Sequence, residues 1–451
     1  MLLAIDKLIY GGNGLARLPA DEKGPGKAVF LPLVLEGERV EAEITEQKPG
    51  FARARAGKIL EASPHRVAPA CPYFGECGGC HYQHADYEHQ LEIKSAILRE
   101  TLRRVGKIEL AQEIRAHPSP PWNYRNRTRL RVRTRPFVLG YNRLGSNELL
   151  PVEQCPISSR LINKAITTLW QMGKSGGVSH HITEIELFAN AEDNQLMAEL
   201  TVHEPGRPGG AGVPGEPGLD TLEWKSDLPE FVRAFRTAVP ETMGAAIFHP
   251  GPQGALERED IPSELQETFG GDCLLYSTST ANYQVSAGSF FQSNRFLTDK
   301  LVELVTEGRS GDYALDLYAG TGLFSLMLSQ TFREVGAVEC APFSFHDLKQ
   351  NCPSNVTGYR VMVDKFLAYL PEDAKADLVV ADPPRAGLGE KVARAVVATG
   401  APRITYVSCD PATLARDLTV LLGSGYRIEE AHLVDLFPQT FHIESVIHLV
   451  R

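Results

Sequence analysis

The stretch Asp316-Leu-Tyr-Ala-Gly-Thr-Gly322 places two glycines between an apolar run and a helical segment. From about residue 285 onward, apolar runs alternate with helical segments, which predicts a doubly wound α/β domain over residues 285–451. Such a domain binds its ligand at the carboxyl ends of its strands. The predicted strands are residues 313–318, 334–339, 359–363, 376–382, 403–407, 427–434 and 443–450.

The glycine loop indicates which ligand this domain binds. Its glycines allow a tight turn and a close approach of the backbone. However, it lacks both the lysine of a phosphate-cradling loop and the third glycine of a dinucleotide-binding loop. Glu339 closes the next predicted strand, where such folds bind ribose hydroxyls. A nucleotide without a pyrophosphate fits better, and we expect S-adenosylmethionine.

Two further regions precede this domain. Residues 1–60 alternate short apolar runs with glycine turns, which predicts a small antiparallel β-barrel of the kind that presents oligonucleotide-binding loops or serves as a spacer. Residues 61–284 mix helices and strands in a central α+β domain. Within it, residues 203–219 are too rich in proline and glycine to pack, and the segments 195–202 and 241–248 on either side are expected in one sheet.

Composition places limits on the class of protein. The chain of 451 residues has a net charge of −10, which argues weakly against a protein that coats nucleic acid indiscriminately. It has no apolar stretch long enough to span a membrane and no secretory signal at its start, so we expect a cytoplasmic protein. Its eight cysteines are therefore expected to serve ligation or catalysis rather than disulfides.

One segment is strongly basic despite the acidic total. Arginine occupies every second position from Arg125 to Arg135, so in a strand these side chains emerge on one face. A row of guanidinium groups suits the phosphates of a polyanion. The alternative is a solvated strand face, which we disfavour because like charges in a row repel. The expected RNA contacts are Arg127, Arg129 and Arg131.

Four cysteines form a candidate metal site. Cys71, Cys77 and Cys80 lie close in sequence, and Cys155 lies in Glu153-Gln-Cys-Pro156. Four thiolates bind either zinc or an iron–sulfur cluster, and the spacing alone does not choose between them.

A fifth cysteine has the setting of a nucleophile. Cys409 lies between an apolar strand and the start of a helix. The N–H groups and dipole at a helix N-terminus stabilise a thiolate, so we expect the pKa of Cys409 to be lowered.

These motifs together resemble the RNA 5-methyluridine methyltransferases. The resemblance is carried by Cys71-x5-Cys-Gly-Gly-Cys80, the glycine loop, Asp382-Pro-Pro-Arg-Ala-Gly-Leu388, Ser408-Cys-Asp-Pro-Ala-Thr-Leu-Ala-Arg-Asp417 and Pro438-Gln-Thr-Phe-His-Ile-Glu-Ser445. More narrowly, the chain is similar to the 23S rRNA branch, which carries an N-terminal TRAM barrel and a 4Fe-4S cluster. The resemblance therefore favours that cluster over zinc.

The resemblance also implies roles for individual residues. Cys409 would add to C6 of uracil and so activate C5 toward the sulfonium methyl group, and Glu444 would accept the C5 proton. Asp382 would contact the uracil edge beside the methyl donor. The remaining implied contacts are Phe290 with the base and Gln292, Tyr318, Gly320, Glu339 and Asp364 with the cofactor. The chain departs from the family at Leu323, where a polar residue is common.

We therefore expect an enzyme that methylates C5 of a uridine in structured RNA, with 23S rRNA as the expected substrate and neither DNA nor membrane as a partner. Two alternatives are methylation of tRNA uridine-54 by the same chemistry and a non-catalytic RNA-binding iron–sulfur protein. The presence of both Cys409 and Glu444 argues against the second alternative.

Overall fold

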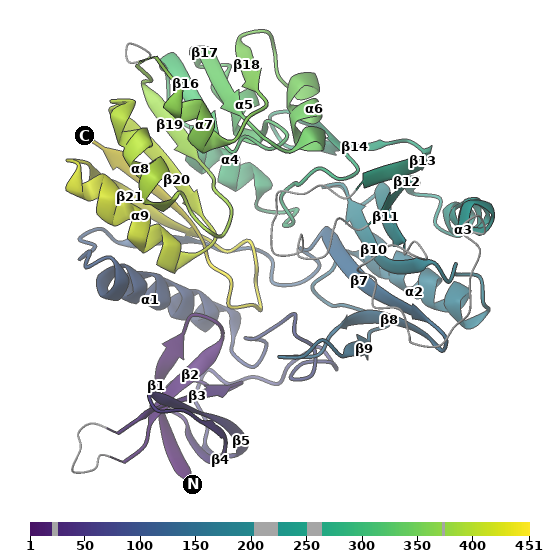
Figure 1. The fold of residues 1–451 in the computed structure, drawn as a ribbon. Helices are drawn as coiled ribbons and strands as arrows, with labels where there is room; N and C mark the ends of the chain where they lie inside the picture. The colour runs from purple at the N-terminus through teal and green to yellow at the C-terminus, as the bar shows by residue number, and fades with distance from the viewer. Residues whose placement is uncertain (20–25, 203–223, 250–263, 372–374) are drawn as a thin grey trace.

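The protein is described by a computed structural model that covers residues 1–19, 26–202, 224–249, 264–371 and 375–451. Figure 1 shows a small β-barrel at the N-terminus, a central α+β part, and a C-terminal α/β part that ends the chain. The proline- and glycine-rich stretch at 203–219 lies outside the described residues.

The N-terminal barrel is closed, in the strand order β1-β2-β3-β5-β4. Its neighbouring strands are antiparallel as expected, except for β3 and β5, which pair in parallel. Alternate residues such as Leu3, Ile5, Val29 and Leu31 point inward and are buried, because successive side chains of a strand face opposite sides. The strands are β1 (Leu2–Ile9), β2 (Asn13–Arg17), β3 (Ala28–Pro32), β4 (Arg39–Gln47) and β5 (Phe51–Glu61).

The central part is built on a sheet in the order β13-β12-β11-β10-β7-β8-β9, packed against two helices. As expected, the strands on either side of the proline- and glycine-rich stretch, β11 and β12, belong to one sheet, in which they are neighbours and pair in parallel. The elements are β7 (Arg127–Thr134), β8 (Phe137–Asn142), β9 (Leu149–Pro151), α2 (Arg160–Lys174), β10 (Ile182–Ala189), β11 (Leu196–Val202), α3 (Trp224–Ala238), β12 (Thr242–His249) and β13 (Glu264–Gly270). A hairpin of β14 (Cys273–Ser277) and β15 (Asn282–Ser286) follows.

The C-terminal part is a twisted sheet in the order β18-β17-β16-β19-β20-β22-β21-β6, with helices on both faces. The alternation of its strand residues explains both layers: Leu315 and Leu317 face α1 (Tyr87–Val105) and α7–α9, whereas Ala314 faces α4 and α5. The strands are β16 (Gly311–Leu317), β17 (Phe332–Val338), β18 (Val356–Tyr359), β19 (Leu378–Ala381), β20 (Arg403–Ser408), β21 (Arg427–Val434) and β22 (Glu444–Val450). The helices are α4 (Thr298–Thr306), α5 (Leu323–Leu328), α6 (Pro342–Asn351), α7 (Val363–Ala368), α8 (Gly389–Ala398) and α9 (Pro411–Gly423).

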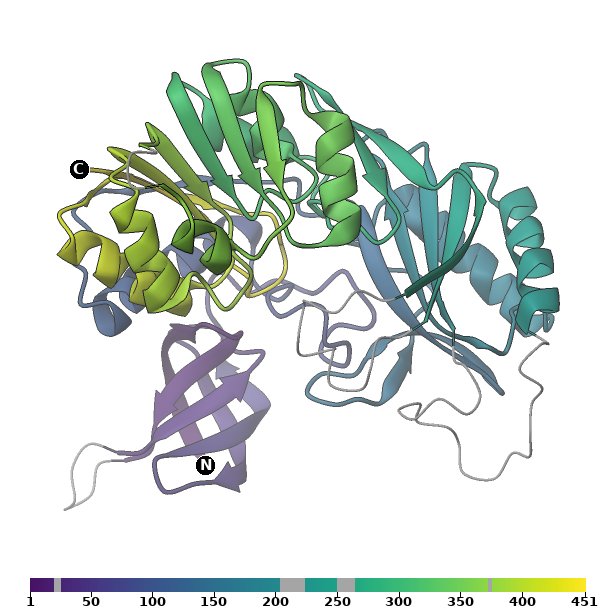
Figure 2. The same ribbon diagram turned by 45° about the horizontal axis from the view of Figure 1, so that its top comes forward.

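One sequence-based expectation for this sheet is wrong, and one of its strands was not predicted. The strand predicted over 359–363 ends at Tyr359, and Val363 already begins α7. The sheet also gains an edge strand, β6 (Ile114–His117), which pairs in parallel with β21 although it precedes the central sheet in sequence. Its neighbour α1 (Tyr87–Val105) packs against α9 and touches β1, so it lies between the barrel and the C-terminal part, as its label in Figure 1 shows; Figure 2 gives the same arrangement in a second view. None of the described helices combines the length and the apolar character needed to cross a membrane.

Candidate active site

The glycine loop leaves β16 in an unusual backbone conformation. Tyr318, Gly320 and Gly322 have φ values of 66°, 55° and 90°, respectively. A Cβ atom added at Gly322 would lie 2.7 Å from the Sγ atom of Cys352, whereas one added at Gly320 would meet nothing within 4 Å. Gly322 therefore packs closely against α6, while Gly320 borders open space in which a ligand could lie.

Glu339, the carboxylate that the sequence analysis expects to bind ribose, is tied to this loop. It lies just beyond β17, and its carboxylate accepts hydrogen bonds from the N–H groups of Gly320 at 2.9 Å and Ala341 at 2.6 Å. A carboxylate accepts up to about four hydrogen bonds, so it keeps capacity for a ligand. Asp364, in contrast, is not at a strand end. It lies in the first turn of α7 and forms an ion pair with Lys391 at 3.0 Å.

The strand register brings Cys409 and Glu444 to the same edge of the sheet. Strands β20 and β22 are antiparallel, and Ser408 pairs with Ser445. Cys409 follows the end of β20 and Glu444 begins β22, so each lies one residue beyond this pair, toward the same edge. Asp382 follows the neighbouring strand β19 and reaches this edge as well. It does not cap α8, because that helix starts after Leu388 with no capping side chain.

The carboxyl groups at this edge retain protons more strongly than usual. Burial raises the pKa of Asp382 from 3.8 to about 7. Burial, reinforced by the nearby charge of Asp382, also raises the pKa of Glu444, against the opposing effect of Arg385. Two adjacent carboxyl groups with little solvent resist ionising together. Arg385 was not assigned a role from the sequence, although it lies within one of the quoted motifs.

The pKa of Cys409 differs from the sequence-based expectation. Burial and then the charges of Glu444 and Asp382 raise the pKa of Cys409 to about 12. The helix N-terminus does not compensate, because Asp410 caps α9: its carboxylate accepts the N–H groups of Ala412 and Thr413, each at 2.9 Å. The expected thiolate is therefore not the resting form.

The segment that contains Phe290 and Gln292 joins the β14–β15 hairpin to α4 of the C-terminal part. Phe290 is 66% exposed, whereas Gln292 is buried. Asn294 anchors the segment, since its side-chain amide donates to Ser119 and to the carbonyl of Leu436, both at 3.0 Å. The ring of Phe290 is therefore accessible to a base, and the anchored Asn294 holds the segment that carries it.

The structure also brings residues to this edge that the sequence analysis missed. The hydroxyl group of Tyr10, in the barrel, donates to the carbonyl oxygen of Cys409 at 3.3 Å. Its ring meets Phe441 edge to face, and His81 contacts the same Phe441 ring. His442 follows, and burial lowers its pKa to about 3, so it is neutral. No local pattern in the sequence indicates that the barrel reaches this far.

The four candidate ligand cysteines lie near enough for their charges to act on one another. Burial raises the pKa of Cys71, Cys77 and Cys80, and the charge of Cys155 acts on all three in the same direction. Their sulfur atoms are nevertheless not among the described groups of ligand atoms that all lie within 4.8 Å of one another. Tetrahedral zinc holds its sulfur ligands only about 3.8 Å apart.

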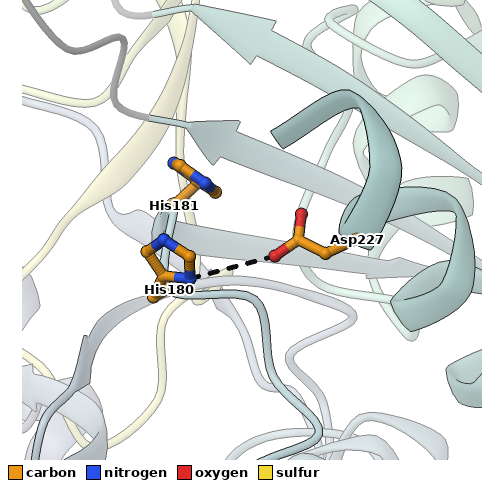
Figure 3. A group of neighbouring side chains, drawn as sticks. All are labelled: His180, His181 and Asp227. Atoms are coloured by element: carbon orange, nitrogen blue, oxygen red, sulfur yellow. Dashed lines mark ion pairs between the residues drawn. The ribbon is translucent and has the colours of Figure 1, made fainter. Parts of the chain in front are cut away.

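In the described part of the chain, two groups of histidine and carboxylate side chains do place their ligand atoms within 4.8 Å of one another. Figure 3 shows the first, in which His180 forms an ion pair with Asp227 at 3.9 Å and its ring lies 4.0 Å from that of His181. The two rings are tilted by 36° to each other. In the second, His432 hydrogen-bonds to Glu430 with one nitrogen and to His117 with the other.

Strand β7 carries its arginines on one face, as predicted, but the protein itself supplies anions to the first two. Arg127 forms ion pairs with Glu186 on β10 and with Glu199 on β11, and its side chain is only 13% exposed. Arg129 also pairs with Glu186, at 2.7 Å. Arg131 is exposed and hydrogen-bonds to the neutral groups of Asn142 and Asn147. The repulsion expected along this row is thus relieved internally at Arg127 and Arg129.

A second basic surface lies in a cleft between the barrel and α1. Glu100 forms ion pairs with Lys7 and Arg104. The basic residues that line the cleft outnumber the acidic ones, so its net charge is positive. The cleft is lined by Asp6, Lys7, Leu15, Arg17, Glu100, Arg103, Arg104 and Lys107.

Comparisons with known proteins agree with this geometry. Residues 2–56 match the model of the TRAM domain, and residues 265–366 and 370–451 match that of the tRNA (uracil-5-)-methyltransferases. An RNA methyltransferase described as uncharacterised, from Aquifex aeolicus, is 30% identical over 98% of this chain and 97% of its own length. The 23S rRNA (uracil(1939)-C(5))-methyltransferase RlmD of Chromohalobacter salexigens is 32% identical over 100% of this chain and 89% of its own.

A solved structure has the same overall fold. The crystal structure of the Pyrococcus abyssi tRNA (uracil-54, C5)-methyltransferase, in complex with S-adenosyl-L-homocysteine, covers 100% of both chains with a TM-score of 0.73 at 22% sequence identity. From the full-length match to relatives at 30% identity or more, this chain belongs to the RNA (uracil-5-)-methyltransferase family.

Proposed function

We propose that this enzyme transfers a methyl group from S-adenosylmethionine to C5 of a uridine in structured RNA through a covalent adduct with Cys409. The observation that carries the proposal is the meeting of Cys409, Glu444 and Asp382 at one edge of the sheet. The ligand-facing loop of Gly320 and Glu339 lies at the carboxyl ends of neighbouring strands of the same sheet.

Cys409 is suited to the addition step. Uracil C5 is a weak nucleophile, and a sulfur atom added at C6 moves electron density to C5. As the C6–S bond forms, the thiol proton has to leave, because its pKa of about 12 makes the resting group a thiol. We assign this proton to an ionised carboxylate of the Asp382–Glu444 pair, for which the pKa of about 7 at Asp382 is well placed.

The methyl donor supplies an electrophilic methyl group to C5. The product then forms when the C5 proton passes to Glu444, the C5=C6 double bond returns and the bond to Cys409 breaks. Glu444 must be ionised at that moment. Arg385, which lowers the pKa of both Glu444 and Cys409, stabilises the anionic forms of both groups.

We propose that the methyl donor lies in the open space beside Gly320. We assign its ribose to Glu339, whose carboxylate is fixed by two backbone N–H groups. Tyr318 borders the same loop. Gln292 and Asp382 are proposed to contact the donor from the other side. Asp364 is proposed as a further contact, for which it would have to exchange its ion pair with Lys391.

We propose 23S rRNA as the substrate. This is supported by the TRAM match and by relatives named for that activity at 30% and 32% identity. The exposed ring of Phe290 is proposed to stack on the base, and Arg131 and the cleft between the barrel and α1 are proposed to bind phosphates. Arg127 and Arg129 are better explained as parts of the central sheet.

The four cysteines are proposed to hold a 4Fe-4S cluster. Their thiols lie within reach of one another's charge but are too widely spaced for tetrahedral zinc, which favours a larger cluster. The positive iron core would offset the burial and mutual repulsion that raise the thiol pKa values.

The proposal is tested with purified protein, labelled S-adenosylmethionine and ribosomal RNA or tRNA. Methylation of a uridine in 23S rRNA is expected, and a Cys409→Ala variant should form neither product nor adduct with 5-fluorouridine RNA. If only tRNA is methylated, the 23S rRNA substrate is refuted and the alternative, methylation of tRNA uridine-54, is supported. A Cys409→Ala variant that still methylates would refute the covalent route.

A further inference from the structure

The turn between β1 and β2 carries the barrel into the candidate active site. Tyr10 follows β1, and its hydroxyl group donates to the Cys409 carbonyl oxygen at 3.3 Å across a separation of nearly the whole chain. Burial and the charges of Asp410 and Cys409 raise the pKa of Tyr10, so the hydroxyl group remains a donor at any working pH.

The same tyrosine also contacts the segment that leads into Glu444. Its ring meets Phe441 edge to face, with 5.4 Å between the ring centroids and an angle of 89° between the planes. Phe441 lies three residues before Glu444. A single side chain of the barrel thus contacts the chain segments that carry both proposed catalytic groups.

This turn packs tightly against the segment that contains His81. Gly12 has a φ of 82°, and a Cβ atom added there would lie 2.9 Å from the Cβ of His81. His81 follows Cys80, and the N–H groups of His81 and Tyr82 donate to the carbonyl oxygen of Gln439 at 2.8 and 2.9 Å. The barrel turn, the cysteine loop and the 437–442 segment therefore pack into one junction.

The 437–442 segment is held by further hydrogen bonds from outside the barrel. The barrel contact of the Cys409 carbonyl oxygen is the hydrogen bond from Tyr10. Gln439 adopts a φ of 68°, and its backbone N–H and side chain exchange hydrogen bonds with the buried side chain of Gln90 at 2.9 and 3.0 Å. The Cys409 peptide lies between a strand end and a capped helix, and its orientation sets the direction in which the sulfur atom points.

We propose that Tyr10 is a positioning residue for methyl transfer: the barrel fixes the Cys409 peptide through the tyrosine hydroxyl group and the Glu444 segment through the tyrosine ring. The proposal rests on the covalent route described above. The barrel then contributes to the addition step itself and not only to the capture of RNA.

The test measures adduct formation with the full chain, S-adenosylmethionine and 5-fluorouridine RNA under single-turnover conditions. Tyr10→Phe keeps the ring and removes the donor. At saturating RNA, its rate of adduct formation should fall about 3- to 10-fold, the range expected for one hydrogen bond. Its RNA dissociation constant and its melting temperature should stay at the wild-type values. Tyr369→Phe, which removes a hydroxyl group from a side chain that is 87% exposed, is the matched control and should react normally.

Gly12→Ala provides an independent perturbation, because it displaces the turn from His81 while Tyr10 is intact. It should slow adduct formation at saturating RNA as well, and it serves alone if Tyr10→Phe does not fold. Wild-type rates in both variants would overturn the positioning role. So would weaker RNA binding with an unchanged saturated rate, which would mean that the turn only docks RNA. A wild-type protein that forms no adduct would instead refute the covalent route.

Discussion

Replacing Arg127 should mainly cost stability, although its position in a row of arginines suggests a role in RNA binding. In the structure its guanidinium group pairs with Glu186, lies 3.1 Å from Glu199, donates to the carbonyl of Ser289 and stacks 5.1 Å from the ring centre of Phe188. Arg127→Ala removes all four contacts and leaves two buried carboxyl groups.

The size of the effect follows from what remains. Removing one partner of a buried ion pair costs about 3–5 kcal/mol. Glu186 keeps Arg129 at 2.7 Å and Glu199 keeps the N–H group of Gly288 at 3.1 Å, so we expect the lower end, about 3 kcal/mol. Adding Glu199→Gln to Arg127→Ala should recover part of the loss, because it removes an unpaired charge.

Urea unfolding measures this loss, and Arg131→Ala is the comparison. Arg131 is exposed, so its replacement should change the unfolding free energy by less than about 0.5 kcal/mol. If it contacts phosphate, it should also reduce the slope of log affinity against log salt by about 1. The reasoning is refuted if Arg127→Ala unfolds like the wild type and instead shows the reduced salt slope.

Three further predictions follow from the site. Glu444→Gln should form the adduct but accumulate it with ordinary uridine RNA, since an amide cannot accept the C5 proton; release at the wild-type rate, measured on denaturing gels, would assign the base elsewhere. Asp382 has a pKa of about 7 in the folded chain against 3.8 otherwise, so its contribution to stability is complete below about pH 4 and is lost as the pH rises through 7; Asp382→Asn should flatten that part of the pH–stability curve. Protein purified without oxygen should be brown and hold about four irons per chain, and Cys155→Ser should lose them; colourless, active protein with stoichiometric zinc would contradict the cluster.

The elements that the sequence predicts correctly are those with a clear local pattern of apolar residues. The strand expected over 427–434 is present as Arg427–Val434, because its apolar residues face buried layers on both sides. The predicted barrel is likewise confirmed, as is the prediction that the segments of β11 and β12 belong to one sheet. Strand β6, in contrast, has only four residues and acquires its role from pairing with a distant partner, which no local pattern encodes.

In the candidate site, too, local motifs predict some features, whereas contacts between distant segments determine others. Motifs locate Cys409, Glu444 and Asp382, but they do not give their protonation. A helix start after Cys409 predicts a stabilised thiolate, whereas Asp410 occupies the helix donors and two carboxyl groups oppose ionisation. Tyr10 escapes detection because its contact with Cys409 depends on how two distant parts of the fold pack.

The pairing of β6 with β21 affects how the protein assembles during translation. Ile114 leaves the ribosome long before its partner Ala431, a delay of about 15 to 60 s at ordinary elongation rates. During that time α1 exposes the apolar face that will later pack against α9 and the C-terminal core, including Leu98 and Leu102. The central sheet is thereby an insertion into the α/β part. A fragment that begins at residue 285 would lack an edge strand and a covering helix, and it should aggregate rather than fold.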